Sequence, residues 1–132
     1  MAHDRIDSAG LVTRLRAETG SPTRVTFTVA NPTGAARTFC DYHTPIEGIR
    51  NDIFVVVAAD TGDEVEYGGM MAKRAAPDDD NYITLAAGEE RSAEVDLLDG
   101  YDLPPGRYSV RFRGSGICGL PDSAPIDIVI SA

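Results

Sequence analysis

Two short runs of alternating residues constrain most strongly what this chain can fold into. In RVTFTVAN (24–31), Val25, Phe27 and Val29 share one face, and in RYSVRF (107–112) every second residue is again aromatic or aliphatic. A period of two is the pattern of a strand that buries one face in an antiparallel sheet. Both runs therefore predict half-buried strands.

The rest of the chain continues as short extended segments between turn residues. Further strands are expected in LVTRLRAET, ARTFCDY and PIDIVIS, and two short extended pieces in YITLAAGEERSAEVDL around Ala87-Gly88-Glu89. A hairpin is expected from IFVVVAA into VEYGG, and only a weak helical period appears at 97–103. Many short strands without βαβ alternation indicate an all-β fold of two packed antiparallel sheets. The prediction is an immunoglobulin-like antiparallel β-sandwich of about 7–8 strands, without the Cys…Trp…Cys spacing of antibody domains.

Length and charge limit the organisation and the partners. The 132 residues predict one domain, 10–132, after a polar flexible leader, 1–9. The chain has no apolar run long enough for a membrane span and no apolar signal-peptide stretch. A cytoplasmic location is expected as written, or secretion if the sequence is a trimmed fragment. The net charge of −9 opposes binding to nucleic acid or an anionic membrane and fits solubility, and it also suits a basic partner.

The sequence is similar to a known module over residues 24–113. The motifs that carry the resemblance, in order, are VANPT, HTPIEG, AKRAAP, LAAGE, and VDLLDGYDLPPGRY. Together they resemble the β-sandwich domain N-terminal to the catalytic domain of bacterial deuterolysin-like (aspzincin) metalloproteases. Zinc catalysis in that family needs His-Glu-x-x-His, and this chain has only His3 and His43. The resemblance therefore implies a relative of the accessory domain without the protease domain.

The stretch CDYHTPIEG (40–48) brings a thiol and an imidazole close in sequence. A Cys–His nucleophilic pair needs hydrogen-bond contact and a third orienting group, whereas Cys40 and His43 start on opposite faces of a strand. A buried Cys40 at a strand end, followed by a bend before Pro45, is the favoured interpretation. Cys40 and Cys118 are either small buried thiols or one disulfide, the latter if the loop GSGICG lies near the end of the Cys40 strand.

No metal or cofactor is predicted. Asp78, Asp79, Asp80 and Asn81 offer oxygen ligands for calcium, but they lack the EF-hand spacing and fit a solvated acidic loop better. Zinc held by Cys40, His43 and Cys118 has no spacing motif either.

The segment GGMMAKRAAPDDD (68–80) is the most distinctive surface candidate. Met70 and Met71 cannot both enter one core face, and methionine suits adaptable binding surfaces. Lys73 and Arg74 offer adjacent positive charges. The structural alternative is a long connection that covers a sheet edge.

The function that follows is a non-catalytic protein-binding module, an accessory or inhibitor-like domain whose partner is a metalloprotease. Its loops 43–51, 68–81 and 114–124 are the expected contact surfaces. The candidate residues are His43, Glu47, Met70, Met71, Lys73 and Arg74. The second hypothesis is a structural domain that associates with itself through a sheet edge. The third is a small hydrolase that uses Cys40 and His43.

Overall fold

Eight strands form the fold in the computed structural model, which describes residues 5–73 and 75–131. All of the strand pairs are antiparallel. The strands are β1 (Val12–Ala17), β2 (Arg24–Ala30), β3 (Arg37–Cys40), β4 (Phe54–Ala58), β5 (Tyr82–Leu85), β6 (Glu90–Asp96), β7 (Gly106–Phe112) and β8 (Ile126–Ile130). The prediction of an all-β sandwich is confirmed, whereas its immunoglobulin-like character is a finer statement and stays a prediction.

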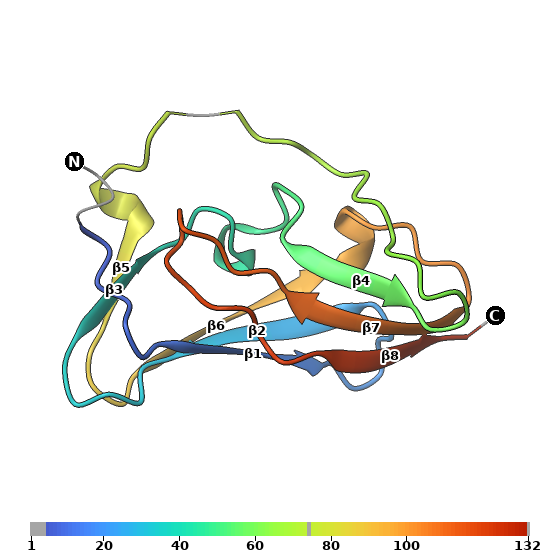
Figure 1. Cartoon of the computed structure of the whole chain (residues 1–132), viewed down its shortest axis with the longest axis horizontal. Coiled ribbons are helices and arrows are strands. Elements are labelled where there is room, and N and C mark those ends of the chain that lie inside the picture. The colour runs from blue at the N-terminus through green and yellow to red at the C-terminus, as the bar shows by residue number, and fades with distance from the viewer. Residues whose placement is uncertain (1–4, 74, 132) are drawn as a thin grey trace.

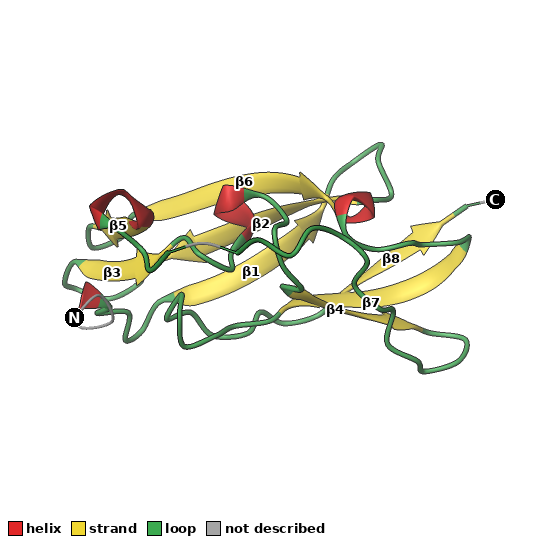
Figure 2. Ribbon diagram, turned by 90° about the horizontal axis from the view of Figure 1, so that it is seen from above, coloured by secondary structure: helices red, strands yellow, loops and turns green. Residues whose placement is uncertain are grey.

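Two three-stranded sheets supply the layers of the sandwich. One has the order β1-β2-β6 and the other the order β4-β7-β8, and Figures 1 and 2 show them as two separate groups of strands. The alternation in the sequence explains the packing, because the apolar face of β2 and that of β7 both turn inward. Phe27 and Phe112 are fully buried, and their ring centroids lie 4.7 Å apart. This contact joins the two sheets at the centre of the core.

A third sheet, formed by β3 and β5, was not expected. It lies beyond one end of β2 and β6 (Figure 2). The chain leaves β2 through the turn 31–36 before β3, and it turns at 86–89 between β5 and β6, where Gly88 has a φ of +81°. Asn31 in the first turn bonds to Gly88 and Glu89 in the second, so the pairing of β2 with β6 ends at these turns and a separate pairing of β3 with β5 begins beyond them.

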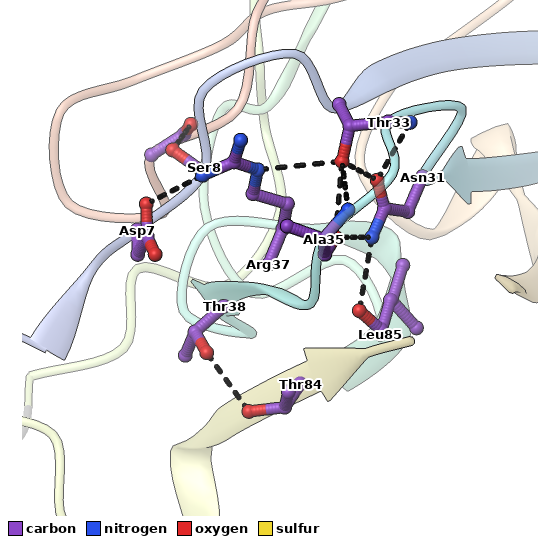
Figure 3. A network of polar contacts seen from close by, with 10 residues as sticks. Asp7, Ser8, Asn31, Thr33, Ala35, Arg37, Thr38, Thr84 and Leu85 are labelled. Atoms are coloured by element: carbon purple, nitrogen blue, oxygen red, sulfur yellow. Dashed lines mark hydrogen bonds and ion pairs between the residues drawn. The ribbon is translucent and has the colours of Figure 1, made fainter. Parts of the chain in front are cut away.

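Asn31 holds this junction. Its side chain is 1% exposed, and Nδ2 lies within hydrogen-bond distance of the carbonyl oxygens of Ala35 (2.8 Å), Leu85 (3.0 Å) and Ala86 (3.2 Å). Oδ1 accepts from the amide and the hydroxyl of Thr33 (Figure 3). The backbone of Asn31 also bonds across the junction, to Gly88 and Glu89. One buried residue thus joins both turns.

Three short 3₁₀ helices fill the connections: η2 (Pro45–Glu47), η3 (Asp79–Asn81) and η4 (Leu97–Asp99). The weak helical period expected near 97–103 corresponds to η4. The hairpin after β4 turns as expected, with Gly62 at a φ of +75°, but in place of a regular strand its returning segment makes isolated bridges, between Val57 and Glu64 and between Tyr67 and Tyr101. In the part of the chain that the structure describes, no helix is long and apolar enough to cross a membrane.

Residues 5–9, which the sequence assigns to the leader, contact the sandwich. Asp7 and Thr38 exchange two backbone hydrogen bonds of 2.9 Å each, and Arg37 pairs with the Asp7 carboxylate at 3.1 Å. Arg5 lies over the Tyr82 ring, 4.3 Å from its centroid. These contacts could not be predicted from the polar composition of the segment, because most of them use backbone groups or exposed charges.

The junction yields a stability prediction. Asn31→Ala removes the amide donor from the buried Leu85 carbonyl and from the less buried Ala86 carbonyl, so we expect the free energy of unfolding to fall by about 2–4 kcal/mol. Urea denaturation measures this change. Thr84→Ala is the matched control, because it removes one exposed hydrogen bond, to Thr38, and is expected to cost less than about 1 kcal/mol. Equal effects of the two substitutions would contradict the role given to Asn31.

Candidate functional site

The bend CDYHTPIEG is pinned by its own polar residues. Thr44 is fully buried; its hydroxyl donates to the Asp41 carbonyl (2.7 Å) and accepts from the Ile46 amide (3.2 Å) as the N-cap of η2. Pro45 fits the first position of a helix because its missing N–H needs no partner there. The prediction of a strand end followed by a bend is confirmed.

His43 and Glu47 are part of this bend. His43 adopts a φ of +60°, which is uncommon for a residue other than glycine, and its amide donates to Glu47 Oε2 at 2.9 Å. The side chain of Glu47 therefore stabilises a strained turn. Both residues are half-buried, and their predicted role in binding a partner stays a prediction.

Cys40 lies at the end of β3 and is fully buried. Burial raises the pKa of its thiol, and the nearby Asp41 carboxylate and Cys118 raise it further, whereas the Tyr42 amide, 3.5 Å from Sγ, opposes them. The thiolate is the nucleophilic form of cysteine, so this environment disfavours attack by Cys40. The Cys40–His43 nucleophilic pair stays a hypothesis.

The acidic segment 78–81 caps a short helix. Asp78 Oδ1 accepts from the Asp80 amide (3.0 Å), and Asn81 Nδ2 donates to Asp41 Oδ1 (3.1 Å). Asp79 forms an ion pair with Arg5. Among the described residues, no group of three or more histidine, cysteine or acidic side chains is placed to hold a metal ion.

The segment 68–73 crosses the surface as an anchored strap. It begins beside η4, where the Gly68 amide donates to the Gly100 carbonyl (2.8 Å), and Gly69 packs so closely that an added Cβ would lie 2.7 Å from the Asp99 carbonyl. Farther along, the Ala72 amide donates to the Arg50 carbonyl (3.0 Å). Figure 1 shows the described part of this connection, 68–73, running above β4 in that view.

The strap exposes the predicted methionines. Met70 is 56% exposed and Met71 is 66% exposed, although the backbone around them is anchored, and Lys73 is also exposed. Arg74 lies outside the described residues. The contact between Ala72 and Arg50 brings the strap next to the loop that follows η2, so two of the three predicted contact loops meet.

A groove opens beside Met71. Its volume is about 420 Å³, and its lining consists of Asp52, Glu64, Val65, Glu66, Tyr67 and Met71. Arg113 approaches two of the carboxylates, at 3.1 Å from Glu64 and 3.8 Å from Asp52. The groove thus combines acidic walls with an apolar surface. This groove could not be predicted from the sequence, because its residues come from three separate segments.

Tyr101 is buried behind the groove and contacts two of its lining residues, Asp52 and Tyr67. It is 2% exposed, donates to Asp52 Oδ1 (2.7 Å) and accepts from the Phe54 amide (3.0 Å). Its ring contacts that of Tyr67, with centroids 5.5 Å apart. Burial and the hydrogen bond to Asp52 raise the pKa of the Tyr101 phenol well above its ordinary value. One buried phenol therefore fixes both an acidic and an aromatic wall.

Comparison with known proteins links the chain to a protease. No protein-family model matches it. A protein named extracellular protease, from Aeromonas hydrophila, is 38% identical to it over 52 residues, which is 39% of this chain and 15% of that protease. The chain therefore matches only a small part of that relative's length. This partial similarity supports a protease association at a coarse level.

Tyr101 gives a prediction for alkaline pH. Folding raises the pKa of the Tyr101 phenol, so the unfolded chain releases this proton at a lower pH than the folded chain does. The contribution of Tyr101 to stability is therefore complete below about pH 10 and is lost as the pH rises further. Compared with Tyr101→Phe, the native chain should lose up to about 1.4 kcal/mol of unfolding free energy per pH unit above that point. Urea denaturation of both proteins at several pH values measures the difference. A difference that stays constant into the alkaline range would contradict the prediction.

Proposed function

We propose that this chain is a non-catalytic protein-binding module that acts with a metalloprotease, as an accessory or inhibitor-like domain. The observation that carries the proposal is the pair of exposed methionines on the anchored strap 68–73, beside an acidic groove. Exposed flexible apolar side chains on a fixed backbone suit a binding surface that adapts to its partner. The partial similarity to an extracellular protease supports the class of partner.

The environment of Cys40, the cysteine closest in sequence to His43, supports the non-catalytic part of the proposal. Cys40 is buried and its thiol has a raised pKa, which makes it a poor nucleophile. The proposal requires no cofactor. An extracellular location goes with it, because the similar protease is named as extracellular.

The strap residues test the proposal. We expect Met70→Ser/Met71→Ser to weaken binding to an extracellular metalloprotease of the native organism by about tenfold or more, with the fold intact. Partners recovered with the immobilised chain from lysate and medium are identified by mass spectrometry, and the purified protease is then titrated against both variants by interferometry.

Val12→Thr is the matched control, because Val12 is an exposed apolar residue (43%) on β1, away from the strap. Its binding should equal that of the native chain. If no metalloprotease binds the native chain, or if the methionine variant binds as tightly as the control, the proposed contact surface is wrong.

Self-association is a second candidate function. β8 lies at the edge of its sheet, and Val129 on it is 56% exposed. An edge strand with exposed apolar residues can pair with a second copy, although Asp127 on the same strand opposes this. If self-association occurs, sedimentation velocity should show a dimer whose fraction rises with concentration, and Val129→Lys should abolish it. A monomer at every concentration would remove this candidate.

A further inference from the structure

We propose that Cys40 and Cys118 form a disulfide when the chain folds in an oxidising environment, and that this bond fastens the loop 114–120 to the end of β3. The cysteines are 78 positions apart in the sequence, yet the structure makes them direct neighbours. The Cys40 amide donates a 3.1 Å hydrogen bond to the Cys118 carbonyl. The strand end and the glycine-rich loop therefore run side by side at these two residues.

This hydrogen bond limits how far apart the two Cα atoms lie. One N–Cα bond, the 3.1 Å hydrogen bond and the distance from the carbonyl oxygen to its own Cα add up to at most about 7 Å. Disulfides span Cα separations of about 4.4–6.8 Å, so this hydrogen bond keeps the two residues within or close to the separation that a disulfide needs.

The thiols are held in a way that oxidation would disturb little. Both cysteines are fully buried. Cys40 Sγ accepts from the Tyr42 amide at 3.5 Å, and Cys118 Sγ lies 3.3 Å from the Ser115 hydroxyl and 3.4 Å from the Leu120 amide. Sulfur is a weak hydrogen-bond partner, so rotation of the two side chains toward one another sacrifices little.

The loop around Cys118 is already shaped for close packing. Gly119 has a φ of +81°, and an added Cβ would lie 2.6 Å from the Ile6 side chain. The Ser8 hydroxyl donates to the Gly119 carbonyl. The loop is thus enclosed between residues 6–8 on one side and β3 on the other, and a disulfide would make the second attachment covalent.

The oxidant is a small-molecule disulfide such as oxidised glutathione. The two thiols give up two protons and two electrons through a mixed disulfide, the Sγ–Sγ bond forms, and two molecules of the reduced small thiol are released. Because both side chains are buried in the folded chain, the reaction takes place during folding, before the loop 114–120 closes over Cys118. Once folded in the reduced form, the chain should react slowly with thiol reagents.

The experiment is to refold the full chain in a glutathione redox buffer and, separately, under reducing conditions. We expect the oxidised monomer to be lighter by about 2 Da, and a peptide map without reduction should show Cys40 linked to Cys118. The bond closes a long loop in the unfolded chain, so we expect the oxidised form to melt about 10 °C higher than the reduced form.

Cys118→Ser is the control, and its melting temperature should not depend on the redox buffer. The comparison of the two redox forms of the native chain does not depend on whether this variant folds. Two titratable thiols in denaturant after oxidative refolding would overturn the proposal. So would a glutathione adduct on one cysteine, or dimers linked between chains in place of the internal bond.

Discussion

The buried amide of Asn31 is the interaction on which the rest of the molecule depends. It lies where β2 gives way to β3 and where β5 gives way to β6, and it bonds to both turns. A carbonyl left unpaired in this interior would cost more than the hydrogen bond itself contributes, so both turns are fixed at one level. The positions of the third sheet and of the loops attached to it follow from where Asn31 holds these two turns.

The loops follow from the third sheet in a short series of contacts. β3 ends at Cys40, next to Cys118, and the Asp41 amide then donates to the Asn81 carbonyl at 2.8 Å. These bonds place the bend 41–48, the start of η3 and the loop 114–120 around one strand end. Tyr101 does the same for the groove, through Asp52 and Tyr67. The buried side chains of Asn31 and Tyr101 thus position loops that lie outside the hydrophobic core.

The strands could be predicted from the sequence because their information is local. Alternation places Phe27 and Phe112 inward whatever the rest of the chain does, and Pro45 and Gly62 mark a bend and a turn by their own backbone preferences. The third sheet was not predictable in this way. NPTGA reads as a turn, but the carbonyl groups that Asn31 binds belong to Leu85 and Ala86, more than 50 positions away. The groove was missed for the same reason, since Asp52, Glu66 and Met71 meet only in the fold.

Charge and apolar contact contribute to different steps of binding at the proposed surface. The net charge of −9 acts at long range and affects the rate at which a charged partner arrives, an effect that salt weakens. At the groove itself, Arg113 already lies close to Asp52 and Glu64, so the local attraction is smaller than the number of carboxylates suggests. On the proposed function, the exposed methionines, whose contacts salt does not screen, would act only on contact and would set how long a bound partner stays. The acidity of the chain would then affect chiefly the rate of encounter.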